Sequence, residues 1–198
     1  MRRNDFRESV GACEIYYSVF DGTWSEPKLI SSPENGSTEP YLINTNDKAY
    51  VAWTDVKSVD SDNVAKSLNS TDIRMSVFDK NTLTFGDALD VTHDTDVDEY
   101  SDNTPILSQT TKNGKDLIMV YYLKSYYEQN NALVGDIINP YTIAACRIYD
   151  VNSGKFVDDY SELEKENISA IHNTKKQIFT TFIINPHFLY FLLLLYRQ

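Results

Sequence analysis

One segment of eight residues occurs twice in this chain, and its recurrence constrains the fold more than any other feature. Residues 14–21 read EIYYSVFD, and residues 72–79 read DIRMSVFD, 58 positions further on (72 minus 14). A weaker third copy at 143–150 ends in RIYD, 71 positions after the end of the second (150 minus 79). Repeats at such spacings are typical of supersecondary units that stack on one another.

Each unit is expected to hold four short antiparallel strands. The repeated segment is β-branched and aromatic, which is the composition of a strand. In the second unit a strand led by Pro40 comes first, an aromatic strand follows at 49–53, and an outer strand returns over 83–91 after the repeated segment. Pro105 repeats the position of Pro40 65 residues later (105 minus 40). This pattern predicts an all-β fold of the β-propeller kind.

The chain is expected to form an incomplete β-propeller of about two and a half blades. The repeats occupy 1–160, and the half blade and the two fuller blades cover 14–30, 39–94 and 103–160. Residues 55–71 are expected to be a long polar connection and 124–140 an insertion. Closing a propeller takes about four to eight blades, so an open arc is predicted. Open blade faces favour self-association or further blades in a longer protein.

The sequence changes character after residue 160. Residues 161–198 form a charged linker and an ill-defined hydrophobic tail, and 178–196 is strongly apolar. The tail has three interpretations: a membrane-spanning helix, a segment that folds back over the open arc, or an end that is not native sequence. Pro186 lies inside the apolar run and weighs against a helical span, because proline breaks helical hydrogen bonding.

The net charge and the number of cysteines restrict which partners and which cellular compartment are expected. The 198 residues include 29 acidic and 18 basic ones, a net charge of −11, so nucleic acid is not an expected partner. Cys13 and Cys146 lie in different units and predict no disulfide framework, and Cys146 is expected to be a buried thiol. The charged N-terminus has no apolar h-region, so no signal peptide is expected in this chain. The expected setting is a longer extracellular or cell-surface protein.

Residues 18–24, SVFDGTW, resemble the Asp-box of sialidase-type β-propellers, whose pattern is Ser/Thr-x-Asp-x-Gly-x-Thr-Trp. The match is one residue shorter than the pattern. The second unit keeps the beginning at 76–79, while 80–82 reads KNT, and the third unit keeps Asp150 and Gly154. The resemblance spans 14–160 and implies four-stranded blades in which the boxes have a structural role.

The same resemblance bears on catalysis. Sialidases hold the substrate carboxylate with a cluster of arginines and use a Tyr nucleophile with a Glu partner. Only Arg74 and Arg147 lie in the repeats of this chain, which is too few for a cluster of three. No HExxH, CxxC or phosphate-binding loop occurs in the sequence. Enzyme activity is therefore not expected of this chain alone.

An acidic loop over 90–99, DVTHDTDVDE, is the best candidate for a metal site. Asp94, Asp96 and Asp98 alternate, so in a curved loop their carboxylates could converge as the hard oxygen ligands that Ca²⁺ prefers. The loop lacks the glycine and the distant glutamate of an EF-hand. Calcium is the cofactor expected at these residues, and the alternative is a solvated polar loop between blades.

Aromatic residues supply the candidate ligand contacts. Tyr126 and Tyr127 stand beside the polar run EQNN, and aromatic residues next to amides on a loop are typical of binding surfaces. Trp53 and Tyr121 fall in central strands and are expected in the core between blades. The expected function is a binding or scaffold module that presents blade loops to a glycan or protein partner. The alternative is a fragment of a sialidase-like glycoside hydrolase that lacks its active-site blades.

Overall fold

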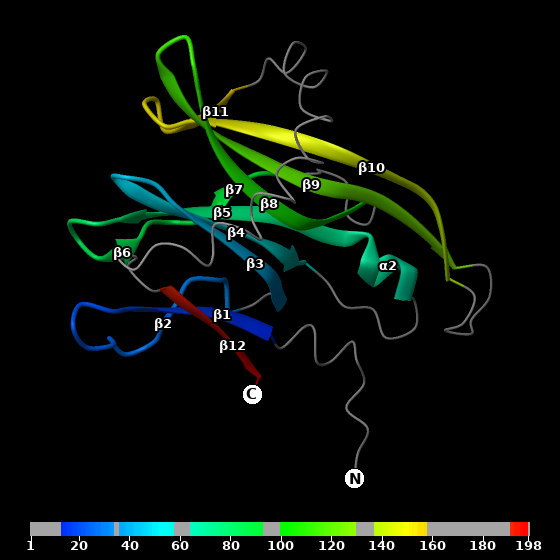
Figure 1. The fold of residues 1–198 in the computed structure, drawn as a ribbon. Coiled ribbons are helices and arrows are strands. Elements are labelled where there is room, and N and C mark those ends of the chain that lie inside the picture. Colours follow the sequence, from blue (N-terminus) through cyan, green and yellow to red (C-terminus); the bar gives the residue numbers. More distant parts are fainter. Residues whose placement is uncertain are drawn as a thin grey trace, which may run out of the picture.

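The computed structural model describes residues 13–33, 36–57, 64–92, 100–129, 137–157 and 191–197. Within these ranges the protein is all-β with a single short helix, so the predicted all-β class is confirmed. The strands form three layers, which lie one above another in Figure 1. The second and third layers belong to one hydrogen-bonded sheet that folds onto itself, and the first layer is a separate sheet of three strands.

The first layer is built around the first copy of the repeated segment. Its central strand, β1 (Cys13–Val19), pairs antiparallel with β2 (Lys28–Leu29) on one side and with β12 (Phe191–Arg197) on the other. Gly22 lies in the turn after β1 with a φ of 82°. Glycine suits this turn because it lacks the Cβ that makes positive φ unfavourable.

The second layer is an antiparallel meander centred on the second copy. It consists of β3 (Gly36–Asn44), β4 (Lys48–Val56), β5 (Ser70–Asp79), β6 (Thr84–Phe85) and β7 (Leu89–Asp90). β6 and β7 both pair with β5, so the predicted outer strand is present in two short pieces. The connection predicted over 55–71 is shorter than expected, because β4 and β5 extend into it and the helix α2 (Val64–Leu68) lies between them.

The third layer repeats the meander with longer strands. It consists of β8 (Tyr100–Lys112), β9 (Lys115–Gln129), β10 (Ile137–Asp150) and β11 (Lys155–Val157). A short parallel pairing of Ser70 and Thr71 with Tyr100 and Ser101 joins it to the second layer. The insertion predicted over 124–140 was wrong, because β9 continues to Gln129 and β10 begins at Ile137. Residues 124–129 read KSYYEQ, which resembles a polar loop, yet they continue the ladder between β9 and β10.

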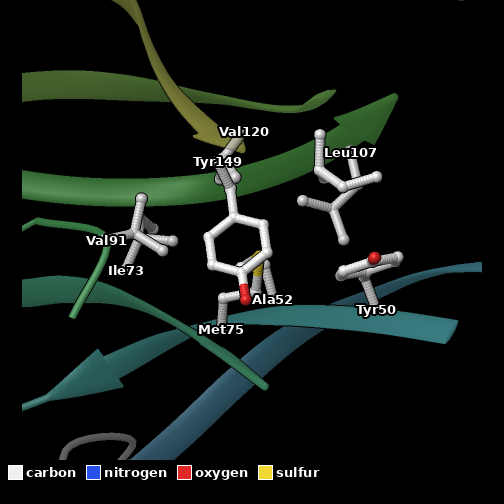
Figure 2. Packing of buried hydrophobic residues seen from close by; sticks show 9 residues of the cluster. Tyr50, Ala52, Ile73, Met75, Val91, Leu107, Val120 and Tyr149 are labelled. Carbon is white, nitrogen blue, oxygen red and sulfur yellow. The ribbon is translucent and has the colours of Figure 1, made fainter. Parts of the chain in front are cut away.

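The second layer is buried on both faces, and this explains the continuous apolar character of β4. Val51 and Trp53 pack with Ile15 of the first layer. The alternate residues of β4, among them Tyr50, face the third layer in a cluster of nine: Tyr50, Ala52, Ile73, Met75, Val91, Leu107, Ile118, Val120 and Tyr149. Figure 2 shows the Tyr149 ring pointing from β10 toward the second layer. A strand buried on two faces cannot show the alternation of a half-exposed strand.

The Pro-led strands of the second and third layers share an unusual backbone feature. Both β3 and β8 contain a bulge, and each bulge holds a residue of positive φ directly before proline. Glu39 has a φ of 53° and Thr104 a φ of 55°. Positive φ is uncommon for residues with a Cβ, so its recurrence at equivalent positions identifies the two layers as structural repeats.

The turn after the repeated strand also recurs. The Asp79 side chain accepts the backbone N–H two residues ahead, at 2.7 Å. The Asp150 side chain accepts the N–H groups two and three residues ahead, at 2.9 and 3.1 Å. Leu83 and Gly154 end the two turns with φ values of 57° and 68°. The sequence RIYD therefore marks the same turn as SVFD, although it shares only its aspartate at the same place.

The C-terminal strand β12 occupies the place in the first layer that β4 occupies in the second. β12 pairs antiparallel along all of β1, from Cys13 opposite Arg197 to Val19 opposite Phe191. Of the three interpretations of the tail, the one in which the chain folds back agrees with residues 191–197, because they pair with β1. The rest of 178–196 lies outside the described residues. Among those described, no helix is long and apolar enough to cross a membrane.

Candidate binding rim

The stacked layers have two unlike rims. At one, here called the turn rim, strands are joined by connections that range from Asn113-Gly114 between β8 and β9 to residues 20–27 between β1 and β2. At the other, here called the loop rim, lie α2 and the strand ends that border the connections 30–35, 57–69, 91–99 and 130–136 (Figure 1). Long connections on a rigid sheet scaffold are where binding residues are usually found. The loop rim is therefore the candidate functional surface.

Buried polar side chains gather at the strand ends that reach the loop rim. They include three carboxylates, Asp55, Asp72 and Asp102, one each from β4, β5 and β8. The hydroxyl and amide members are Ser37, Thr54, Asn69, Ser70, Thr71, Thr92, Ser101 and Ser125. Buried polar groups need hydrogen-bond partners, so this belt fixes the geometry of the strand ends more strictly than apolar packing would.

The Asp72 carboxylate joins the belt to two connections of the loop rim. Its Oδ2 lies 2.5 Å from the Nζ of Lys57, and its Oδ1 accepts the Thr92 hydroxyl at 3.3 Å. The Thr92 oxygen in turn accepts the backbone N–H of Ile73 at 2.9 Å. On the neighbouring strand the Ser37 hydroxyl donates to Asp55 at 2.9 Å. These contacts fix the strand ends next to the connections 57–69 and 91–99.

The two bulge residues of positive φ, Glu39 and Thr104, are in contact at this rim. The Glu39 carboxylate accepts the backbone N–H of Thr104 at 2.9 Å and the Thr54 hydroxyl at 3.1 Å through the same oxygen. Glu39 and Thr104 are equivalent positions, so one repeat directly caps the bulge of the next. The inner strands of the two layers are thereby fixed relative to one another.

Tyr126 belongs to a group of aromatic and cationic side chains on the third layer. Its ring packs edge-on against Tyr100 with 6.3 Å between the ring centroids. The Lys124 ammonium lies 4.4 Å from the centroid of the Tyr100 ring, a cation–π contact. Tyr126 and Tyr127 are both partly exposed, so the structure brings both predicted residues to the loop rim. They lie in β9 and not in an insertion.

Tyr127 is held through its backbone by a residue of the second layer. The Asn69 side chain donates to the Tyr127 carbonyl at 2.9 Å and accepts the Tyr127 N–H at 2.9 Å. The sequence analysis did not single out Asn69, Tyr100 or Lys124. Tyr100 and Lys124 could have been found from the register of β8 and β9. Nothing in the sequence indicates that Asn69 reaches a strand so far along the chain.

The predicted calcium ligands Asp94, Asp96 and Asp98 lie outside the described residues. Within the described part of the chain, no group of three acidic, histidine or cysteine side chains could hold a metal ion. The calcium site therefore stays a prediction.

The burial and contacts of the other candidate residues show where each of them lies. Trp53 and Tyr121 are buried, as expected of core positions. Arg74 pairs with Asp90 at 2.7 Å, and Arg147 lies over the Phe156 ring in another layer. The two arginines therefore do not converge. The two cysteines form no disulfide, and Cys146 is half-buried, not fully buried as predicted.

Comparison with known proteins gives no relative from which a function could be transferred. No family model, no curated protein and no solved structure matches the chain. The contacts of the loop rim are therefore the basis for a functional assignment.

Proposed function

We propose that this chain is a binding module that presents its loop rim to a glycan, as part of a longer extracellular or cell-surface protein. The observation that carries the proposal is the contrast between the rims. The connections 57–69 and 91–99, of 13 and nine residues, join strand ends at the loop rim, beside a hydrogen-bonded polar belt and beside Tyr100, Tyr126 and Tyr127, whereas the connections at the turn rim in the described part of the chain have eight residues or fewer. A rigid scaffold with variable connections and partly exposed aromatic side chains is the usual construction of a binding surface.

The three layers are, in this proposal, consecutive blades of an open β-propeller related to the sialidase type. Three observations support it: the four-stranded meander recurs, the bulges recur before proline, and Asp79 and Asp150 cap equivalent turns. The last of these is the structural role that the Asp-box resemblance implies. The proposal assigns no catalytic step to this chain, because Arg74 and Arg147 have separate partners.

A neutral glycan fits the rim better than an anionic ligand. The net charge of −11 repels anions at long range. Tyrosine rings offer flat apolar faces to the C–H groups of a sugar, and their hydroxyls can bond to sugar hydroxyls. The buried serine, threonine and asparagine side chains of the belt hold the strand ends that carry these rings. A protein partner would instead be expected to bury a larger apolar patch at its centre.

The proposal is tested with the soluble neutral hexasaccharides cellohexaose, maltohexaose and chitohexaose and with sialyllactose, each titrated calorimetrically into the full chain. Binding of a neutral hexasaccharide is expected, and Tyr126→Ala with Tyr127→Ala should weaken it about tenfold or more. The matched control is Trp24→Ala, which removes an exposed aromatic residue of the turn rim. Equal losses with the control would contradict the assignment of the loop rim.

Two further outcomes separate the alternatives. Preference for sialyllactose would favour the alternative function, a fragment of a sialidase-like glycoside hydrolase, over a module that binds neutral glycans. Failure of all four sugars to bind would refute the glycan proposal, and a protein partner would then be sought by crosslinking from Tyr126.

A further inference from the structure

The contact between Asn69 and Tyr127 joins two repeats at the proposed binding surface. Asn69 lies directly after α2 in the second layer and is 6% exposed. Its amide group donates to the Tyr127 carbonyl and accepts the Tyr127 N–H, both at 2.9 Å. One side chain therefore satisfies both backbone groups of one residue in β9. This is the pattern that a neighbouring strand would make.

The place of this contact along β9 explains why it is needed. The pairing of β8 with β9 ends at Ser101 opposite Ser125, and β8 begins one residue earlier, at Tyr100. β9 continues past that point, paired with β10 on its other side, where Tyr126 lies opposite Tyr141. An unpaired strand edge carries exposed N–H and C=O groups that are costly to bury and open to pairing with another chain. Asn69 takes the place of the missing strand at Tyr127.

We infer that Asn69 is a positioning residue for the ligand-binding surface, an inference that rests on the proposed function. The fixed backbone of Tyr127 sets the direction of its own ring and of the adjacent Tyr126. The Tyr126 ring can pack against Tyr100 only if that stretch of β9 stays in place. The surface is therefore composite, since a connection of the second layer positions the aromatic residues of the third.

The contact with Tyr127 requires a side chain that has both a donor and an acceptor. Asparagine provides one donor and one acceptor in the arrangement of a peptide group. Asn69→Asp keeps the size and the acceptor, but its carboxylate cannot donate to the Tyr127 carbonyl. Asn69→Ala removes both bonds. The two variants therefore form a graded series, and Asn81→Ala on the turn rim is the matched control, since its side chain makes no part of this contact.

The test combines a measurement without ligand and one with ligand, on the full chain. Amide hydrogen exchange followed by NMR should become about tenfold faster at Tyr127 in Asn69→Ala and less so in Asn69→Asp. The amide of Val120, in the middle of the same strand, should be unchanged. Affinity for the hexasaccharide that binds the wild type should fall in the same order at a temperature where all variants are folded. If Asn69→Ala does not fold, Asn69→Asp and the wild type carry the comparison.

The possible results distinguish the backbone contact, the positioning role of Asn69 and the proposed function from one another. Unchanged exchange at Tyr127 in both variants would overturn the backbone contact itself. Faster exchange with unchanged affinity would overturn the positioning role and leave a contact that only adds stability. If the wild type binds none of the hexasaccharides, the proposed function fails. The exchange measurement, together with the NMR shifts of the Tyr126 and Tyr100 rings, would then still decide whether Asn69 places these residues.

Discussion

At the scale of single residues, aspartates at turns do more to fix the repeats than the longer motif around them. Asp150 accepts two backbone N–H groups, and Asp79 accepts one in the equivalent turn. The first two copies, EIYYSVFD and DIRMSVFD, share five residues, whereas the third, IAACRIYD, shares only its aspartate with them. A short polar side chain at a turn is therefore a better sign of the repeat than overall similarity.

Asp150→Ala should lower the free energy of unfolding, because two hydrogen bonds to the turn backbone are lost. Chemical denaturation of the variant and the wild type measures the difference. The conservative variant Asp150→Asn keeps the acceptor oxygen and should recover most of the loss. No difference between Asp150→Ala and the wild type would show that the turn forms without its cap.

The same contacts predict an acid dependence. Hydrogen bonds from the Ser153 and Asn152 backbone and the charge of Lys115 lower the pKa of Asp150 below its ordinary value of 3.8, against an opposing effect of desolvation. A lowered pKa means that the native state holds the proton less tightly than the unfolded state does. Asp150 therefore contributes stability above about pH 4 that is lost as the pH falls through its native pKa. Wild type and Asp150→Asn should converge in stability as the pH falls through the native pKa of Asp150, and parallel curves would contradict this.

Tyr50 predicts a dependence at the alkaline end. Burial, aided by the nearby Tyr149, raises the pKa of Tyr50 from 10.0 to about 12. Because the raised pKa favours the neutral phenol in the native state, the stability it contributes is present below pH 10 and is lost between pH 10 and 12. Tyr50→Phe should make the unfolding free energy fall less steeply over that window. The pH dependence of urea unfolding measures it, and identical slopes would exclude Tyr50 as the source.

At the scale of elements, strands can be predicted from the sequence where apolar residues are dense, and not where a strand ends in polar residues. Strand positions were predictable for β1, β4 and β5, because β-branched and aromatic residues are dense there. The ends of β9 and β10 were not, because Tyr126 to Gln129 resembles a polar loop when read alone. Only the partner strand, which lies elsewhere in the sequence, shows that these residues continue a ladder.

The two tryptophans provide a matched pair for testing the double burial of β4. Trp53 is 1% exposed between the first and second layers, whereas Trp24 is 48% exposed. Trp53→Ala should cost about 3–5 kcal/mol, because a large cavity opens in the core. Trp24→Ala should change the free energy of unfolding by no more than about 0.5 kcal/mol. Thermal and denaturant unfolding of both variants gives the comparison, and similar effects would contradict the layer packing.

At the scale of the whole molecule, the order of layers follows the order of repeats, but the first layer is completed by the end of the chain. The repeats alone predicted the stack and its open character. They could not predict β12, because the run FLLLLYR resembles nothing in the repeated units. The contacts of Asn69 and Glu39 across layers were likewise beyond the sequence, since their partners are set by how the repeats stack.

Pairing of β12 with β1 can be tested by proline substitution in the full chain. Leu192→Pro together with Leu193→Pro should remove N–H groups from the β1–β12 ladder and leave the edge of β1 unpaired. An unpaired edge favours association, so light scattering should report larger species at equal concentration. Gln198→Pro, one residue beyond the strand, is the control. A monomeric double variant of wild-type stability would contradict the pairing.

The opposition of Cys13 and Arg197 in the ladder has a practical consequence for any engineered fusion. Both described ends of the chain leave the molecule at the loop rim. An affinity tag, a reporter domain or a surface tether joined directly to Cys13 or to Arg197 would thus stand next to the proposed binding surface. The Asn113-Gly114 turn at the opposite rim is the better insertion point for a label. A reporter placed there would lie at the rim opposite the proposed binding surface.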